Sequence, residues 1–171
     1  WDLGFGDSTA IWFVQMVAGQ YRIIDYLENN RQAIDYYVRQ IQAKNYVYER
    51  HYLPHDGRHA NLATGKTIQE IVEGFGLRVE IVPQIGIDNG INAVRMAMPN
   101  VWIDENKCKE GIKALEYYHY ETDKNGNRRN IPAHDWSSHG CDAFRYMAVA
   151  FKESVKHKPI KKAYVQHGWM G

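Results

Sequence analysis

The segment from His134 to Tyr146 constrains the fold most, because it begins the last long helix that the sequence predicts. Pro132 precedes this segment and Asp135 is an N-cap candidate, so we expect a helix from Asp135 to about Lys156. One stripe at helical spacing is apolar and predicts packing on a core. A second stripe is polar and holds Asp135, His139, Asp142 and Tyr146. It is either a solvated helix side or a carboxylate kept near the interior for a cation.

The length and charge of the chain limit its organisation. Its 171 residues, of which 44% are hydrophobic, suffice for one domain with a sizeable core, so we expect a single domain over residues 1–171. The chain begins with Trp1 in strand-like sequence, and we expect it to be a piece of a longer polypeptide. The formal net charge of +1 means that a nucleic-acid partner would have to be bound by local patches.

Cysteine usage and hydropathy exclude other classes of protein. Cys108 and Cys141 lack a Cys-x-x-Cys partner, so neither a disulfide framework nor a zinc knuckle is indicated and a reducing, intracellular setting is expected. No apolar run approaches the roughly 20 residues that span a bilayer, and no leader sequence is present at the N-terminus. We therefore expect a soluble protein without a membrane partner.

The predicted elements alternate between strands and helices. Residues 1–3, 9–17 and 20–27 are expected to form an opening meander of three strands. The later elements are a helix from about residue 31, a strand at 46–53, a helix opened by a Thr67–Glu70 capping box, a strand at 79–82, a helix at 88–98, an extended piece at 101–103, a helix opened by Asp104 and a polar hairpin tip at 122–130. This order predicts an α/β fold with a mixed sheet flanked by helices, as in ribonuclease H-like proteins. The basic tail after Lys156 is expected to be poorly ordered.

Three aspartates lie on elements that are far apart along the chain. Asp2 is on the first strand, Asp56 directly follows the fourth and Asp142 is on the last helix. In a mixed sheet the first and fourth strands can be neighbours, and a helix packed across them would bring the third carboxylate close. Crowded carboxylates repel unless a divalent cation neutralises them, and oxygen ligands favour Mg²⁺ or Mn²⁺. Two such ions about 4 Å apart would support phosphodiester hydrolysis by water. From spacing alone, ordinary aspartates in turns and caps remain the alternative.

Three segments together resemble the C-terminal nuclease domain of the phage terminase large subunit. They are residues 2–10, the loop 53–57 and the helix start 134–146, and their order and spacing cover nearly the whole chain. The resemblance implies a ribonuclease H-like fold that cuts double-stranded DNA with two metal ions, Mg²⁺ or Mn²⁺, during genome packaging. It places the three acidic metal ligands at Asp2, Asp56 and Asp142. His139, one turn before Asp142, is a further candidate catalytic residue.

The resemblance also implies partners and a location. These are an ATPase motor on an N-terminal domain outside this chain, a small terminase subunit, a portal, and the cytoplasm of the host cell. One feature departs from the family, whose first strand carries several apolar residues before its aspartate, whereas only Trp1 precedes Asp2 here. This departure predicts a shortened strand, a loosely held Asp2 and weakened metal affinity.

Several polar residues have more than one interpretation. Asp7 either contributes to a metal site or stabilises the glycine turn that contains it. Asp135 is an auxiliary site residue or, preferably, an N-cap. His139 orients Asp142, assists a metal or donates to the scissile phosphate, and the preferred role is a hydrogen bond that orients a ligand. The candidates for gripping DNA phosphates are Arg58, Lys66, Arg128, Arg129 and the lysines of the tail.

Two further motifs suggest a nucleotide site and a zinc site, but neither is complete. Residues 60–67 resemble a phosphate loop, but Ala60 replaces its first glycine. The histidines at 51, 55 and 59 have a regular spacing, but a proline and a glycine interrupt the helix that would align them for zinc. The rivals are another ribonuclease H-like nuclease or strand-transferase, such as a junction resolvase or transposase core, and a non-catalytic DNA-binding or assembly module.

Overall fold

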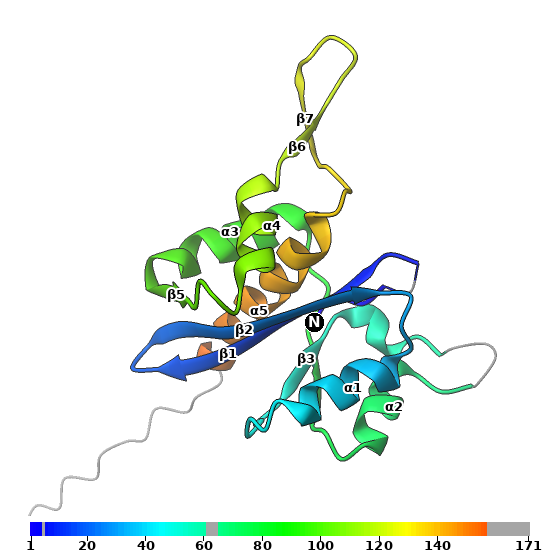
Figure 1. Ribbon diagram of the computed structural model, residues 1–171. Coiled ribbons are helices and arrows are strands. Elements are labelled where there is room, and N and C mark those ends of the chain that lie inside the picture. The colour runs from blue at the N-terminus through cyan, green and yellow to red at the C-terminus, as the bar shows by residue number, and fades with distance from the viewer. Residues whose placement is uncertain (5, 61–64, 157–171) are drawn as a thin grey trace, which may run out of the picture.

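The computed structural model describes residues 1–4, 6–60 and 65–156 (Figure 1). Its elements are β1 (Ser8–Val17), β2 (Gln20–Asn30), α1 (Ile34–Ala43), β3 (His51–Leu53), η1 (His55–Arg58), α2 (Ile68–Gly74), β4 (Val79–Ile81), α3 (Ile87–Ala97), η2 (Met98–Asn100), β5 (Val101–Ile103), α4 (Lys109–Tyr117), β6 (Tyr120–Thr122), β7 (Arg128–Pro132) and α5 (Ser138–Lys156). Among the described residues, no helix is long and apolar enough to cross a membrane.

The β1–β2 hairpin is the longest paired unit of the fold. Its two strands are antiparallel and are joined through Ala18 and Gly19, whose positive φ angles of 52° and 79° suit a two-residue turn between twisted strands. β5 adds to β2 in parallel, and Asp2 bridges Ala10 of β1 in the antiparallel sense. The predicted opening meander is confirmed for its second and third strands, β1 and β2, and the sheet is mixed, whereas the first predicted strand, residues 1–3, is reduced to the isolated bridge at Asp2.

The first and fourth predicted strands are neighbours, as expected. The Trp1 amino group donates a hydrogen bond of 3.0 Å to the carbonyl oxygen of Tyr52 in β3, while Asp2 bonds to β1 on its other side. β3 in turn pairs in parallel with β4. Trp1 and Asp2 therefore lie between β1 and β3, so both sheets meet where the first candidate carboxylate is found.

The strand predicted at residues 46–53 is too long, because only His51–Leu53 form β3. The tyrosines before it make side-chain bonds to other elements. The Tyr46 hydroxyl donates to Asp25 Oδ2 in β2 at 3.2 Å, and the Tyr48 hydroxyl donates to the Ile41 carbonyl oxygen in α1 at 2.9 Å. These bonds tie the segment to α1 and β2, and it does not continue as a strand.

Alternate residues of β1 supply two cores, one on each face of the hairpin. Ala10 and Trp12 pack with buried residues of α3 and α5, whereas Ile11 and Phe13 pack with buried residues of α1. Helices α3, α4 and α5 accordingly lie on one side of the hairpin, and α1 and α2 on the other (Figure 1). Helices cover both faces, as the sequence pattern predicts.

Helix α5 begins at Ser138 and not at Asp135, so the predicted helix start is three residues too early. Asp135 Oδ1 accepts hydrogen bonds from the Ser137 backbone N–H at 2.9 Å and from the Ser137 hydroxyl at 2.6 Å. The Ser138 hydroxyl donates to the Asp135 carbonyl oxygen at 2.7 Å. These bonds close a tight turn before the helix, so Asp135 caps this turn and is not the helix N-cap itself.

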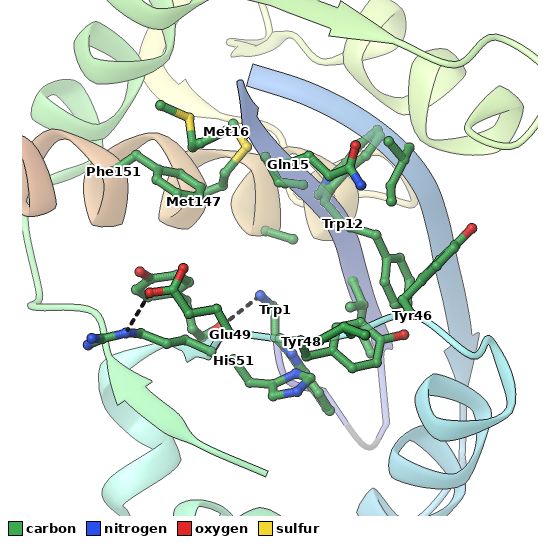
Figure 2. Close-up of a pocket in the computed structure, with 18 of the residues that line it drawn as sticks. Trp1, Trp12, Gln15, Met16, Tyr46, Tyr48, Glu49, His51, Met147 and Phe151 are labelled. Atoms are coloured by element: carbon green, nitrogen blue, oxygen red, sulfur yellow. Dashed lines mark hydrogen bonds and ion pairs between the residues drawn. The ribbon is translucent and has the colours of Figure 1, made fainter. Parts of the chain in front are cut away.

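A groove of about 590 Å³ runs between β1, the segment before β3 and α5 (Figure 2). Its wall is largely aromatic and includes Trp1, Trp12, Tyr46, Tyr48 and Phe151. Asp2, Asp56 and Asp142 are not among the residues that line it. The groove is therefore distinct from the region in which the candidate carboxylates lie.

Candidate active site

Asp2 is held firmly in place by its backbone. Its N–H donates to the Ala10 carbonyl oxygen at 2.8 Å, and its own carbonyl oxygen accepts from the Ala10 N–H at 3.1 Å. The side chain is 17% exposed, and Asp2 Oδ2 lies 3.5 Å from His139 Nδ1 in α5. The expectation that Asp2 is loosely held is therefore wrong, because two backbone hydrogen bonds to Ala10 of β1 fix it.

Asp142 lies on α5 close to Asp2 and is electrostatically strained. Burial raises its pKa to about 6, although the Arg145 guanidinium opposes this shift. The negative charge of Asp2 raises the pKa further, and His139 lowers it. Asp142 Oδ1 forms an ion pair with Arg145 Nη2 at 3.2 Å. The fold thus brings the first and last predicted carboxylates into one electrostatic environment.

Asp56 approaches the same region from η1. Its Oδ1 is buried and has no hydrogen-bond partner among the described residues. Asp56 also affects Tyr146 of α5. Burial has the largest effect and raises the pKa of this tyrosine, and the negative charges of Asp2, Asp142 and Asp56 raise it further. The three predicted carboxylates, which come from three remote parts of the sequence, therefore all act on one side chain.

The side chains as placed do not form a finished metal-ligand set. Within residues 1–4, 6–60 and 65–156, no three His, Cys, Asp or Glu side chains are arranged so that they could hold one ion. Asp2 contacts the side chain of His139 and Asp142 pairs with the Arg145 guanidinium instead. The assignment of the three aspartates as ligands therefore remains a prediction.

His139 contacts Asp2 and not Asp142, which was the carboxylate it was expected to orient. Its side chain is only 12% exposed. The bond to the Asp2 carboxylate raises the pKa of His139, and this effect exceeds the opposing effect of burial. His139 is thus placed to fix the orientation of the Asp2 side chain, whereas Asp142 pairs with Arg145.

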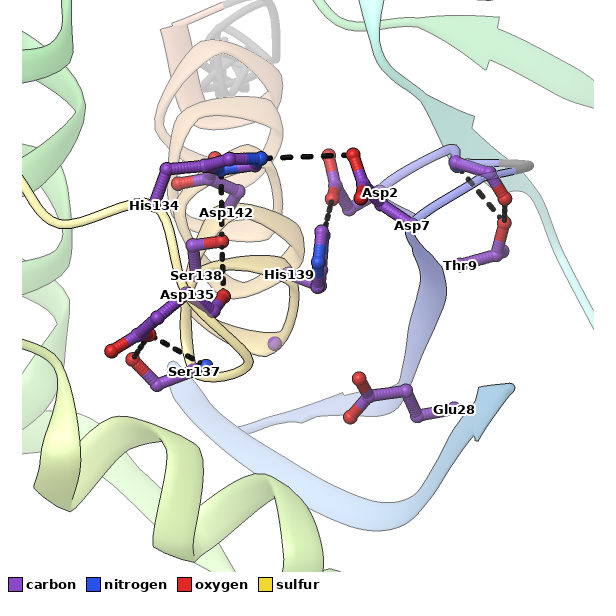
Figure 3. A network of polar contacts seen from close by, with 12 residues as sticks. Asp2, Asp7, Thr9, Glu28, His134, Asp135, Ser137, Ser138, His139 and Asp142 are labelled. Atoms are coloured by element: carbon purple, nitrogen blue, oxygen red, sulfur yellow. Dashed lines mark hydrogen bonds and ion pairs between the residues drawn. The ribbon is translucent and has the colours of Figure 1, made fainter. Parts of the chain in front are cut away.

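Asp7 and His134 form a second contact beside this pair (Figure 3). Asp7 Oδ2 lies 3.6 Å from His134 Nε2, and His134 Nδ1 lies 3.2 Å from the hydroxyl of Ser138. Both Asp7 and His134 are solvent-exposed. Asp7 therefore connects the turn before β1 to the start of α5, and it borders the carboxylate region.

Asp135 has the contacts of a capping residue. Burial raises its pKa, but the hydrogen bonds from Ser137 outweigh burial, and the resulting pKa lies below the usual range of a carboxyl group. Its second oxygen, Oδ2, lies 3.9 Å from His119 Nδ1. Figure 3 shows Asp135 turned toward Ser137, on the side away from Asp2. Asp135 therefore caps the turn before α5, which differs from the preferred prediction of a helix N-cap because α5 begins at Ser138.

The cations predicted to grip DNA lie on two separate parts of the fold. Arg58 ends η1, and Lys66 precedes α2. Arg128 and Arg129 lie on β7 of the hairpin that projects from the body of the domain (Figure 1). Arg128 packs over the Tyr120 ring with its Cζ 3.8 Å from the ring centroid. The structure does not gather these cations into one cluster, and the tail lysines after residue 156 lie outside the described residues.

The two weaker motifs gain no support. Ala60 and Thr67 form an isolated antiparallel bridge, but residues 61–64 of the phosphate-loop-like segment lie outside the described residues. His55 and His59 have ring centroids 6.4 Å apart, and His51 is buried against Trp1 and Tyr48. The described histidines are thus not part of any three-residue metal group.

Sequence reasoning missed the role of Arg145. The side chain of Arg145 is 13% exposed and pairs with Asp142 three residues earlier on the same helix face. The spacing alone was a signal for this pair. The close approach of Gly90 in α3 to the Arg145 side chain carried no such signal, because Gly90 lies on a different helix.

Comparison with known proteins identifies the fold. The family described as the terminase RNaseH-like domain matches residues 1–148. The nuclease domain of the large terminase from bacteriophage SPP1, solved with bound Mn, has a TM-score of 0.61 at 19% sequence identity, and the alignment covers 90% of this chain and 82% of that one. A large terminase from a thermophilic bacteriophage has a TM-score of 0.67 at 14% identity over 88% of this chain.

The chain spans 38% of the length of that thermophilic phage terminase. No curated protein matches the sequence. The structural likenesses agree with the mixed sheet and flanking helices, which are those of ribonuclease H-like terminase nuclease domains. Because the family match extends over residues 1–148, the chain belongs to the family of terminase RNaseH-like domains.

Proposed function

We propose that this domain is a metal-dependent endonuclease that cleaves double-stranded DNA during viral genome packaging. The observation that carries the proposal is that Asp2 contacts His139 of α5, the helix that also carries Asp142, while Asp56 follows β3 with a buried Oδ1 that has no hydrogen-bond partner among the described residues. Membership of the terminase RNaseH-like family supports the reaction class, and the Mn bound to the SPP1 nuclease domain supports the use of a divalent metal.

The chemistry of the three carboxylates fits divalent cations. Burial and the charge of Asp2 raise the pKa of Asp142 to about 6, which means that the ionised form of Asp142 is unfavourable in the fold. A bound cation would stabilise this ionised form. The buried Asp56 Oδ1 has no hydrogen-bond partner among the described residues, and an oxygen in this position needs one. Carboxylate oxygens suit Mg²⁺ or Mn²⁺. Asp2, Asp56 and Asp142 would hold these ions, whose chemistry would be activation of the attacking water and stabilisation of the leaving oxygen of a phosphodiester.

The residues of this chain would hold and orient the reacting groups. Asp2, Asp56 and Asp142 would be the ligands, and His139 would fix the Asp2 carboxylate through their contact. The neighbouring thiol is unsuited to attack the phosphate, because burial raises the pKa of Cys141 to about 12 and its Sγ is engaged by the Ala114 carbonyl oxygen. In the proposed reaction water would be the nucleophile, without a covalent enzyme intermediate.

DNA would be held mainly through its phosphates. Arg58 follows Asp56 by two residues on η1, and Lys66, Arg128 and Arg129 would extend the contact. The partners would be an ATPase domain, a small terminase subunit and a portal, and the reaction would take place in the host cytoplasm. These assignments follow from the family and define the setting in which the nuclease would act.

Digestion of plasmid DNA with Mn²⁺ tests the proposal. Asp56→Ala and Asp142→Ala should each lower the cleavage rate by roughly two orders of magnitude, because each removes a group that stabilises charge in the transition state. Asp88→Ala is the matched control, since Asp88 is an exposed aspartate of α3, and it should cleave like the unchanged protein. Equal digestion by all of these proteins would favour a non-catalytic DNA-binding module and contradict the proposal.

The choice of DNA substrate distinguishes the proposed nuclease from its nearest rivals, a junction resolvase and a transposase core. A terminase nuclease should cut linear duplex DNA at many positions, because packaging requires little sequence reading. A junction resolvase would nick four-way junctions at the joint and leave linear duplex intact, whereas a transposase core would join strands. Either of these two product patterns would replace the proposed reaction with that of the rival.

A further inference from the structure

Arg145 lies largely buried on α5, a helix that packs on the core. Its Nη2 lies 3.2 Å from Asp142 Oδ1, and the two side chains are 13% and 29% exposed. A guanidinium buried to this degree requires a charged partner, since an unpaired charge is costly there. Its Cζ lies 5.6 Å from the centroid of the Tyr146 ring. The charges of all three candidate ligands raise the pKa of this same tyrosine.

The position of Arg145 depends on a glycine in another helix. Gly90 is buried in α3, and a Cβ atom added to it would lie 2.3 Å from Arg145 Cδ and 2.5 Å from Arg145 Cγ. The middle of the arginine stem therefore rests directly against the α3 backbone. Gly90 does not have a positive φ angle, so its backbone conformation does not require glycine. Because glycine weakens a helix interior, the space it leaves for Arg145 is the feature that explains it.

We propose that Arg145 is a positioning residue that holds the Asp142 carboxylate in the orientation needed for a divalent cation, and that Gly90 provides the space for it. This inference rests on the proposed nuclease function. Arg145 contacts Oδ1 of Asp142 at 3.2 Å from the same helix, so the ion pair restricts the orientation of the carboxylate. Residues that bond to a metal-ligating carboxylate, without touching the metal, orient that carboxylate and thereby change the metal affinity. The planar, rigid guanidinium of arginine suits this role.

Mn²⁺ binding to the complete chain, measured by calorimetry, tests this role without relying on activity. Arg145→Gln and Gly90→Ala should each weaken Mn²⁺ affinity about tenfold, the lower end of the loss that follows removal of such a partner. Arg145→Lys keeps the charge but not the planar fork, and it should recover only part of the affinity. In the Arg145→Gln background, Gly90→Ala should cause no further loss, because the two residues act as one unit.

Gly86→Ala is the matched control for the glycine substitution. Gly86 is the N-cap of the same helix, α3, and a Cβ atom there meets nothing within 4 Å. This variant should keep the Mn²⁺ affinity of the unchanged protein within about twofold. Circular dichroism of each variant in EDTA establishes that it is folded, and Arg145→Gln and Arg145→Lys decide the matter if Gly90→Ala does not fold.

The outcomes separate this inference from the proposed function. If the unchanged protein binds Mn²⁺ and Asp142→Ala does not, but folded Arg145→Gln binds it equally well, the positioning role is refuted and the nuclease proposal stands. Tighter binding by Arg145→Gln would also refute it, because Arg145 would then compete with the metal for Asp142. If the unchanged protein binds no Mn²⁺, both proposals are overturned.

Discussion

At the scale of single residues, a buried histidine without a hydrogen bond to its Nε2 makes the stability of this domain depend on pH. His51 is 5% exposed, and its Nε2 has no partner among the described residues. Burial, aided by the N-terminal amino group, lowers the pKa of His51 from 6.5 to about 4. The folded protein therefore keeps His51 neutral at a pH at which the unfolded chain binds a proton.

The sign of this shift predicts acid destabilisation. The stability that neutral His51 contributes is present above pH 6.5 and is lost as the pH falls toward 4. Between pH 7 and pH 5 this loss amounts to about 2 kcal/mol. Urea unfolding at both pH values should show that His51→Phe loses less stability than the unchanged protein by about this amount. The same loss in both proteins would show that His51 is already protonated when folded.

The identity of the site residues was predictable only in part. Asp2, Asp56 and Asp142 stand out because acidic residues follow or lie on elements that a mixed sheet brings together. Arg145 was not predicted to matter, since its environment depends on the missing side chain at Gly90 in another helix. No periodicity of the sequence connects the two residues. Contacts between remote helices of this kind become visible only in three dimensions.

At the scale of elements, local signals predicted well and tertiary contacts changed the remainder. The capping box of α2 is confirmed, because the Glu70 N–H donates to Thr67 Oγ1 at 3.0 Å and the Thr67 N–H donates to Glu70 Oε2 at 2.7 Å. The strand before Leu53 is shorter than predicted because Tyr46 and Tyr48 bond to other elements. A hydrogen bond from a side chain to a remote partner leaves no periodic pattern in the sequence.

The packing of α4 on the sheet gives a prediction at this scale. A Cβ atom on Gly111 would lie 2.3 Å from Trp12 Cη2, and the Trp12 ring is fixed by a 2.8 Å hydrogen bond from its Nε1 to the Gly140 carbonyl oxygen. Gly111→Ala should therefore destabilise the domain by about 1–3 kcal/mol, the usual cost of overpacking. In an open helix the same change would stabilise it by roughly 0.5–1 kcal/mol.

Chemical denaturation of Gly111→Ala and Gly74→Ala checks this prediction. Gly74 ends α2, and a Cβ atom there meets nothing within 4 Å, so Gly74→Ala should change the free energy of unfolding by no more than about 0.5 kcal/mol. Stabilisation by Gly111→Ala would show that α4 can move away from Trp12 without cost, and the described packing would then be wrong.

At the scale of the whole molecule, the domain is nearly neutral, with a formal net charge of +1. Attraction to DNA therefore has to come from local groups of cations and not from the overall charge. The β6–β7 hairpin projects from the body of the domain (Figure 1) and presents Arg128 and Arg129. Arg129 pairs with Glu121 at 2.7 Å, so DNA would have to compete for this arginine.

DNA affinity measured over a range of salt concentrations tests this arrangement. Binding should weaken as salt rises, and replacing both Arg128 and Arg129 with alanine should reduce the slope of log K against log salt by roughly 0.9 for each phosphate contact that is lost. Arg39→Ala is a suitable control, because Arg39 lies on α1 and pairs with Asp35 on the same exposed face. An unchanged slope for the hairpin variant would remove the hairpin from the DNA contact.

The two sheets and the helix α5 meet at one place in the molecule, and the candidate carboxylates lie there. Asp2 is bonded to β1, Asp56 follows β3 and Asp142 is on α5. The resemblance to large terminase nuclease domains predicted this topology, whereas the side-chain pairs of Asp2 with His139 and of Asp142 with Arg145 were not predicted. The architecture follows from the order of elements, but the choice of partner depends on side-chain packing.

A crystal grown with Mn²⁺ and measured near the manganese absorption edge tests the central claim most directly. We predict anomalous peaks in contact with carboxylate oxygens of Asp2, Asp56 and Asp142, because a divalent cation would relieve the repulsion between Asp2 and Asp142 and give the buried Asp56 Oδ1 a partner. Peaks only at other residues, or a map without peaks in crystals that contain Mn²⁺, would contradict the assignment of these three aspartates as the metal ligands.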